Sequence, residues 1–274
     1  MNFFQKIIHS FRQQGRLAQL IIINVALFLT LNLSVHILHI DLLPYLGLPI
    51  GETDFIFKIW TLVTYMFSHE SLGHIFWNML LFYYCAQLFY LILGESRLLY
   101  VYIMSGLSGA ALLLICGILL PDSFSGSILI GASAAVTGVV MVMAIYAPNY
   151  QVSLWGIIQM PFKYFAILTF ILSTFIDFSL NTGGKISHIG GAVFGLLYGL
   201  NLKKGYDFFN FSFLTKNRQK LKIVRGNKSE EVRNEDKRFA ENRMNEILDK
   251  IAKSGYDSLS KKEKDELFNL SQKK

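Results

Sequence analysis

The sequence predicts an all-α membrane protein with six transmembrane helices and a short helical cytoplasmic tail at its C-terminus. Of its 274 residues, 53% are hydrophobic and only 16% are charged, whereas soluble domains carry about 25% charged residues. Six apolar segments are long enough to cross a bilayer. The net charge of +7 lies entirely beyond residue 202. This composition excludes a disordered chain and argues against a soluble enzyme.

The six candidate spans divide the chain into regions. A transmembrane helix needs about 20 mostly apolar residues, and the segments that qualify are Leu17–Ile40, His74–Leu93, Leu98–Leu120, Ile128–Ala147, Phe162–Phe178 and Ile186–Leu202. The first is too long for a signal-peptide core and no clear cleavage site follows it, so we expect it to be retained. The predicted regions are a basic leader over 1–16, a membrane domain over 17–203, a basic linker over 204–228 and a helical tail over 229–274.

The loop charges predict the orientation of these spans. Basic residues lie before the first span, after the second, at the start of the fifth and after the sixth, at Lys6, Arg12, Arg16, Arg97, Lys163, Lys203 and Lys204. Because basic loops stay in the cytoplasm, we expect a multi-pass protein of the bacterial inner membrane with both termini cytoplasmic. The basic tail then faces anionic lipid headgroups, and no nucleic-acid partner is expected. The apolar, aromatic loop 41–73 is expected to lie in or along the membrane interface.

Several kinds of site are disfavoured by the polar residues of the body. No carboxylate pair falls within the spans, which argues against an intramembrane aspartyl protease and against a proton relay. His69 and His74 are five residues apart, whereas a zinc hydrolase helix needs two histidines four residues apart. We therefore expect no metal site. Cys85 and Cys116 lie in apolar runs and are predicted to be buried apolar side chains.

Four polar residues remain, and the topology brings them to one level of the bilayer. His74 opens the second span and Asn78 follows one turn later on the same face. Ser133 lies in the fourth span and His188 in the sixth. These three spans all run inward, which puts both histidines near the outer surface. Ser133 is expected five residues inside its span, about 8 Å deep.

The chemistry of these four residues matches acyl transfer. A serine hydroxyl becomes a nucleophile when an adjacent base takes its proton, and His188 could be that base. The backbone N–H of Ser133, together with His74 and Asn78, could stabilise the oxyanion of a tetrahedral intermediate. Each residue alone has an ordinary structural explanation, such as a serine bonded to its own helix. The combination on matching ends of alternate spans favours catalysis.

Small residues supply a reason for two of these spans to approach closely. Gly191, Gly195 and Gly199 recur every four residues after His188, so they share one face of the sixth span. The fourth span has its own small residues, Gly131, Ala134, Ala135 and Gly138. Docking of these faces would bring His188 to Ser133. His69 could line the mouth of such a site.

These motifs together resemble the rhomboid family of intramembrane serine proteases. The stretch WTLVTYMFSHESLGHIFWNM at Trp60–Met79 resembles the family's first external loop and second helix, with His74 and Asn78 as its His-xxx-Asn pair. GASA at 131–134 resembles the Gly-x-Ser motif, and His188-xx-Gly191-xxx-Gly195 resembles the histidine-helix motif. The resemblance covers roughly residues 15–203. It implies a six-helix core, a Ser133–His188 dyad, no cofactor, and transmembrane proteins as substrates.

Three positions depart from the family's pattern. The usual Trp-Arg pair of the loop is Trp60-Thr61 here, which questions how that loop is anchored. Ala134 stands where glycine commonly follows the serine, and Thr137 stands where an aromatic residue often lies under the histidine ring. All three leave the predicted dyad in place.

The tail and two competing functions complete the predictions. Residues 229–255 read as a charged amphipathic helix, and Ser260 with Glu263 forms a capping box that opens a second helix to about Leu270. Ile247, Leu248 and Ile251 offer a small apolar face.

A rhomboid-like scaffold that binds transmembrane partners without cutting them is the main alternative to a protease. A small transporter would need midplane charges or broken helices, which the sequence lacks.

Overall fold

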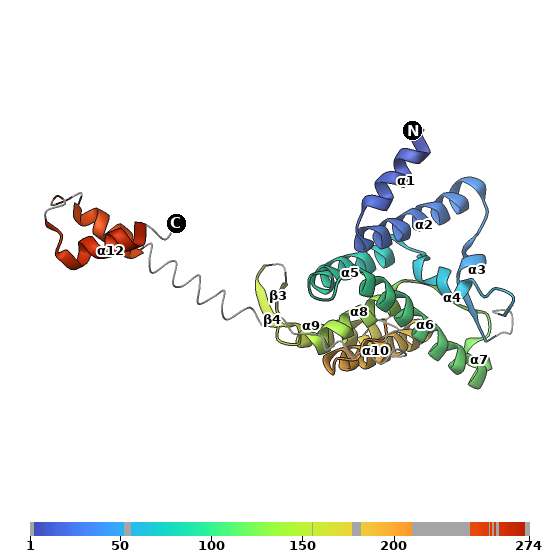
Figure 1. Cartoon of the computed structure of the whole chain (residues 1–274). Helices are drawn as coiled ribbons and strands as arrows, with labels where there is room; N and C mark the ends of the chain where they lie inside the picture. Colours follow the sequence, from blue (N-terminus) through green and yellow to red (C-terminus); the bar gives the residue numbers. More distant parts are fainter. Residues whose placement is uncertain are drawn as a thin grey trace. The chain divides into compact units, whose positions relative to one another are not determined.

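The computed structural model describes residues 3–51, 56–154, 156–176, 182–209, 242–251, 253, 255 and 258–271. The chain forms two compact units, residues 1–218 and 219–274, and Figure 1 shows both. The first unit contains the apolar body and every residue of the predicted site. The second contains the charged tail.

Long helices make up the first unit, and each predicted span overlaps one of them. They are α2 (Arg16–Leu38), α5 (Leu72–Leu93), α6 (Glu95–Leu119), α8 (Ser133–Tyr146), α9 (Phe162–Ile171), which continues as the π-helix η3 (Leu172–Ile176), and α10 (Thr182–Lys203). Within the described residues, three helices are long and apolar enough to cross a membrane, namely α2, α5 and α6. The apolar helices α8 and α9 are shorter.

Helix α8 is the centre of the body. All ten residues from Ala134 to Met143 are buried, and α10, α6, α5 and α9 surround the helix (Figure 1). Small and β-branched side chains such as Ala135, Gly138 and Val139 make this possible, because they let neighbouring helices approach on every side. The sequence of α8 is therefore apolar all round, as expected of a fully enclosed helix.

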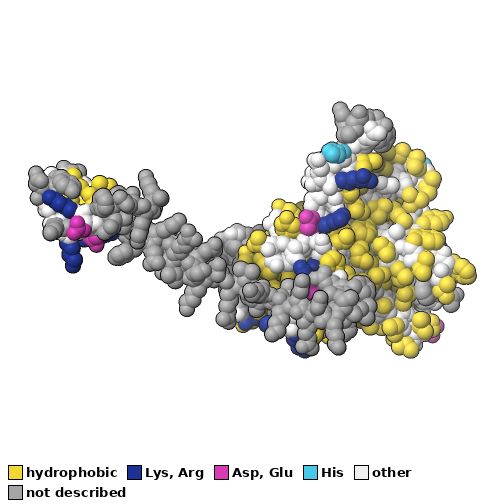
Figure 2. Space-filling view, in the orientation of Figure 1, with side chains coloured by type: hydrophobic (Ala, Val, Ile, Leu, Met, Phe, Trp, Pro, Cys, Tyr) yellow, Lys and Arg dark blue, Asp and Glu magenta, His cyan; other side chains and the backbone are white. Residues whose placement is uncertain are grey.

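The outer surface of the body is apolar as well. Large hydrophobic side chains are exposed along α2, α5, α6 and α9, among them Ile37, Leu91, Ile118 and Ile167, each more than half exposed. Figure 2 shows a broad hydrophobic surface across one face of the body. A soluble protein rarely leaves so much contiguous apolar area in water. Lipid is the solvent that this surface suits, as for an integral membrane protein.

Two short pairs of antiparallel strands correct the all-α expectation. β1 (Leu48–Ile50) pairs with β2 (Ser127–Leu129), and β3 (Gln151–Leu154) pairs with β4 (Ile158–Pro161). The predicted start of the fourth span at Ile128 is also wrong. Residues 127–129 are paired as a strand, and Gly131 adopts a φ of 111°, which is not helical. Ser133 is therefore the first residue of α8 and does not lie five residues inside a helix.

The long loop before α5 is partly inserted into the body. It contains α3 (Leu43–Leu46), α4 (Thr61–Thr64) and the 3-10 helix η2 (Tyr65–Phe67). Tyr65 and Met66 are fully buried, and Met66 fills the space beside Gly106 of α6. Phe57 and Ile59 are 80% and 67% exposed. The loop thus has one edge in the protein core and one apolar edge on the surface.

The second unit is a small helical hairpin. A helix covers residues 242–251, and α12 (Lys261–Ser271) follows. The predicted capping box is confirmed, because the Ser260 N–H donates to Glu263 Oε2 (2.8 Å) and the Glu263 N–H donates to Ser260 Oγ (3.3 Å). Ile247 is buried but Leu248 is 46% exposed, so the predicted apolar face is only partly correct. Residues 229–241 lie outside the described residues.

Candidate active site

Helices α8 and α10 meet through glycine. A Cβ on Gly191 would overlap the Ala134 carbonyl oxygen, and a Cβ on Gly195 would overlap that of Gly138. A Cβ on Gly199 would lie 3.0 Å from the Ile145 Cβ. The two backbones are therefore in direct contact along one face of α10, in the way that small-xxx-small faces allow.

The backbones that carry Ser133 and His188 converge on a third helix. A Cβ built on Gly109 of α6 would lie 2.7 Å from the Ser187 carbonyl oxygen and 2.8 Å from the Ala134 Cβ. Ser187 immediately precedes His188, and Ala134 immediately follows Ser133. Each of the two predicted dyad residues is thus one residue away from the same contact point. The His188 side chain is 8% exposed, and Ser133 is partly exposed.

His74 lies on the other side of Ser133. Ser71 caps α5 by accepting the His74 backbone N–H (3.3 Å), and the His74 imidazole packs against Gly131. A Cβ at Gly131 would lie 2.8 Å from His74 Nε2 and 3.8 Å from Ser133 Oγ. The imidazole and the hydroxyl therefore border the same small space, which stays open because residue 131 is glycine. Its φ of 111° also favours glycine there.

Asn78 is partly exposed one turn below His74, and one of its amide hydrogens is used locally. Its Nδ2 donates to the His74 carbonyl oxygen at 2.9 Å. A primary amide has two N–H donors, so one hydrogen bond does not exhaust the group. The residue therefore combines a bond to its own helix with a position close to His74.

The loop segment Tyr65–His69 holds the turn that leads into Ser133. The Gly131 N–H donates to the Tyr65 carbonyl oxygen (2.9 Å), and the Ala132 N–H donates to His69 Nε2 (3.4 Å). This segment is itself anchored, because the Tyr65 hydroxyl donates to the Gly106 carbonyl oxygen (2.6 Å). The Tyr102 hydroxyl of α6 donates to the Met66 carbonyl oxygen (3.1 Å). Sequence reasoning missed this support, since residues more than thirty positions apart leave no local pattern.

His69 supports the turn only while its imidazole is neutral. Nε2 accepts a backbone N–H, so Nδ1 carries the proton, 3.4 Å from the Phe67 carbonyl oxygen. The side chain is 1% exposed. Burial, reinforced by the His74 ring 5.0 Å away, lowers the pKa of His69 from 6.5 to about 4. The neutral form is therefore the form present near neutral pH.

The His69 pKa predicts acid destabilisation. In the unfolded chain this histidine is protonated below about pH 6.5, whereas in the folded protein it is protonated only below about pH 4. Its contribution to stability is therefore complete above pH 6.5 and is lost as the pH falls toward 4. The full loss is about 3 kcal/mol. Between pH 7 and pH 4.5, the midpoint of thermal unfolding should fall further for the wild type than for His69→Gln. Equal falls in both proteins would contradict this role.

The three departures from the rhomboid pattern each have a local partner. Trp60 Nε1 donates to the Tyr45 carbonyl oxygen (2.8 Å) and Thr61 Oγ1 donates to that of Lys58 (2.6 Å), so these bonds tie parts of the loop to each other. Thr137 Oγ1 donates to the Ser133 carbonyl oxygen (2.7 Å). The Ala134 methyl group lies at the contact with Gly109.

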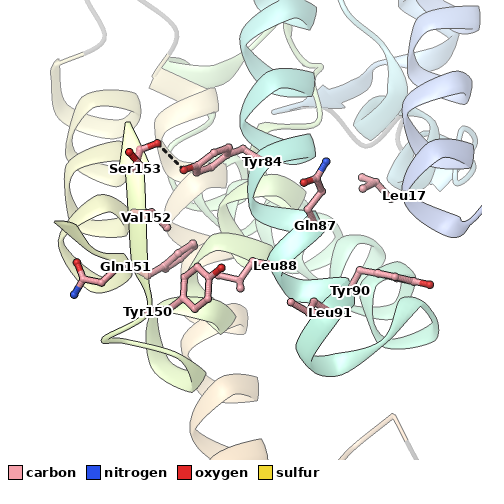
Figure 3. A pocket seen from close by; sticks show the side chains of 11 residues that line it. Leu17, Tyr84, Gln87, Leu88, Tyr90, Leu91, Tyr150, Gln151, Val152 and Ser153 are labelled. Atoms are coloured by element: carbon pink, nitrogen blue, oxygen red, sulfur yellow. Dashed lines mark hydrogen bonds between the residues drawn. The ribbon is translucent and has the colours of Figure 1, made fainter. Parts of the chain in front are cut away.

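A cavity of about 570 Å³ lies elsewhere in the body. Figure 3 shows it between the C-terminal half of α5, strand β3 and Leu17, with the Tyr84 hydroxyl donating to the Ser153 carbonyl oxygen (2.9 Å). Its lining residues on α5 begin at Tyr84, whereas His74 and Asn78 lie in the first two turns. The cavity is thus separate from the candidate site. Within the described residues, no three His, Cys, Asp or Glu side chains gather closely enough to hold a metal ion.

Comparison with known families decides the relationship. A family model, the Rhomboid domain, matches residues 57–205, which is more than half of the chain. The chain belongs to the rhomboid family. Its rhomboid domain has the fold of intramembrane proteases, and the protein is an integral membrane protein. A second model, for a family of unknown function (DUF6576), matches residues 229–273. No curated protein matches the chain.

Proposed function

We propose that this rhomboid is an active intramembrane serine protease that hydrolyses peptide bonds of transmembrane proteins near the outer side of the bilayer. Ser133 is the nucleophile and His188 is its general base. The contact at Gly109 carries this proposal, because Ser187 and Ala134 meet there, next to the two dyad residues. The partly exposed Ser133 remains open to a substrate while His188 is buried.

The reaction follows from these roles. The His188 imidazole takes the Ser133 hydroxyl proton while the oxygen attacks the scissile carbonyl carbon. The resulting imidazolium then gives that proton to the leaving amine as the C–N bond breaks, which leaves an acyl-enzyme. Water, deprotonated by His188, attacks the ester, and Ser133 is released with its proton restored. No cofactor takes part.

The oxyanion of the tetrahedral intermediate requires hydrogen-bond donors. Ser133 is the first residue of α8, and the N–H groups of a helix's first turn have no acceptor within the helix. They also lie at the positive end of the helix dipole. His74, which borders the space beside Ser133 Oγ, and Asn78, one turn further on, are the side chains suited to add donors.

A fluorophosphonate probe tests the proposal, because it forms a covalent adduct only with an activated serine. The purified full-length protein in mild detergent is treated with the probe and the adduct is mapped by mass spectrometry. We expect an adduct on Ser133 in the wild type and none in Ser133→Ala or His188→Ala. Ser187→Ala is the matched control, since its buried hydroxyl donates to the Gly184 carbonyl oxygen of its own helix (2.7 Å), and it should label normally.

Two outcomes would count against the protease. An adduct on another residue, or equal labelling of His188→Ala, would mean that the dyad is wrongly assigned. A folded wild-type protein that reacts neither with this probe nor with a smaller sulfonyl fluoride would favour the scaffold that binds transmembrane partners without cutting them.

The oxyanion donors give a graded prediction. His74→Ala and Asn78→Ala are each expected to lower kcat by about 100- to 1,000-fold with little change in KM, because the interaction exists mainly in the transition state. Asn32→Ala on α2 is the matched control, since Asn32 makes the same bond to its own helix (Nδ2 to the Phe28 carbonyl oxygen, 2.9 Å). If Asn78→Ala and Asn32→Ala lowered kcat equally, Asn78 would have only a structural role.

The orientation of the protein is part of the same proposal. The basic loops favour cytoplasmic termini in a bacterial inner membrane, with the serine end of α8 toward the outside. The partners are then transmembrane substrates and, for the basic tail, the anionic headgroups of the inner leaflet.

A further inference from the structure

The first helix of the chain is amphipathic and basic. In α1 (Phe3–Gln13) the apolar residues stand at positions 3, 4, 7, 8 and 11, the spacing of a single helix face. Lys6, His9 and Arg12 stand on the remaining side. Residues 1–40 contain no Asp or Glu. One side of α1 is therefore suited to an apolar medium and the other to negative charge.

Two side chains of this face are described, and the structure encloses neither, since Phe11 is partly exposed. None of the described elements packs extensively against α1, and Ile8 is 50% exposed. Figure 1 shows α1 extending away from the bundle beyond the start of α2. Such a face in water would be unfavourable, so a partner outside the chain is expected to cover it.

The junction with α2 fixes where that partner lies. Gly15 is extended (φ −64°, ψ 159°), so the chain turns between the two helices. Gln19 Nε2 then donates to the Phe11 carbonyl oxygen (3.1 Å), and the Arg16 guanidinium donates to Gln19 Oε1 (2.9 Å). The Arg16 N–H donates to Glu95 Oε2 (2.8 Å). The bond from Gln19 to Phe11 ties the end of α1 to the first turn of α2, and the bond from Arg16 to Glu95 ties that turn to α6.

The start of the apolar run of α2 sets the expected membrane boundary. The apolar run of α2 begins at Leu17, immediately after Arg16, so α1 ends within one turn of the hydrocarbon edge. An apolar groove of about 470 Å³ opens there, with Arg16 and Leu17 at one side and Tyr83 and Tyr90 of α5 at the other. Apolar side chains and a guanidinium, the two kinds of group that an anionic lipid would contact, are thus both present at this junction.

We propose that α1 is an interfacial helix that binds the anionic leaflet from which α2 enters the bilayer. Its apolar face lies among the acyl chains, and Lys6, Arg12 and Arg16 contact the anionic headgroups. The partner is lipid rather than protein because α1 lies two residues before a transmembrane helix and its charge is complementary to anionic lipid. This binding is independent of the catalytic dyad.

Fluorescence quenching in nanodiscs tests the proposal with the full-length protein. In a Cys85→Ala, Cys116→Ala background, Ile8→Cys or His9→Cys is labelled with bimane, and the lipids carry brominated acyl chains. With phosphatidylglycerol present, the probe at position 8 should be quenched at least about threefold more than the probe at position 9. In phosphatidylcholine alone this difference should fall.

Charge reversal tests the role of the headgroups. Lys6→Glu with Arg12→Glu should remove at least about half of the quenching at position 8. The matched control is Lys203→Glu with Lys204→Glu, which changes the same charge at the end of α10 and should have no effect at position 8.

Three results would overturn the proposal. Equal quenching at positions 8 and 9 would mean that the apolar face does not enter the lipid. Shielding of position 8 from both bromolipid and aqueous iodide would mean that protein covers it. Quenching at position 8 that depends neither on phosphatidylglycerol nor on Lys6 and Arg12 would exclude recognition of anionic headgroups.

Discussion

Ser133→Ala and His188→Ala are each expected to lower kcat for a transmembrane substrate by about 10,000-fold or more. The serine supplies the attacking oxygen and the histidine takes its proton, so either loss stops the same step. The double variant should therefore be no slower than the slower single variant. Cleavage of a model transmembrane substrate in proteoliposomes, measured over long incubations, gives the three rates.

Stability measurements separate this effect from misfolding. Ser133 is partly exposed, and its removal leaves the contact of α8 with α10 intact, so the unfolding midpoint of Ser133→Ala should stay close to that of the wild type. Ser187→Ala should keep its activity. Losses that multiply in the double variant would indicate that the two residues act in separate steps.

Gly191→Val is expected to separate α8 from α10 and to abolish activity. A Cβ at this position already overlaps the Ala134 carbonyl oxygen and would lie 2.8 Å from its carbonyl carbon. Backbone atoms cannot move aside as a side-chain end can, so the helices must part. Overpacking of this kind costs about 1 to 3 kcal/mol and occasionally more. The shift also moves His188, one turn away, relative to Ser133. The midpoint of unfolding and the rate of substrate cleavage should fall together.

Gly199→Ala is the control for the Gly191 prediction. It lies on the same face two turns further along α10, where a Cβ would be 3.0 Å from the Ile145 Cβ and 3.2 Å from the Val142 carbonyl oxygen. This contact is tight but less severe, and it is far from His188, so stability should fall less and activity should persist. Ala134→Gly should not rescue Gly191→Val, since the clash is with backbone. A fully active Gly191→Val would refute the close contact.

The positions of the helices could be predicted from the sequence because hydropathy is a local property. The apolar runs found α2, α5 and α6 to within a few residues, and the glycine spacing after His188 correctly indicated the face of α10 that meets α8. Packing of this kind depends on side-chain size, which a sequence displays directly.

The start of α8 and the support for its first turn could not be predicted in the same way. A short apolar run such as residues 128–130 suits a strand or a helix, and the pairing of Leu129 with Leu48 decides between them. His69 accepts a bond from Ala132, and Tyr65 accepts one from Gly131. These partners are distant in sequence, so only the folded chain reveals them.

The short length of α8 has a consequence for hydration. Fourteen residues reach about 21 Å, whereas the hydrocarbon core of a bilayer is about 30 Å thick. The turn at Gly131 precedes the serine end of α8, and a non-helical backbone is tolerated at membrane depth only beside protein or water. In the protease that we propose, this serine end of α8 is where water would reach a peptide bond below the headgroups.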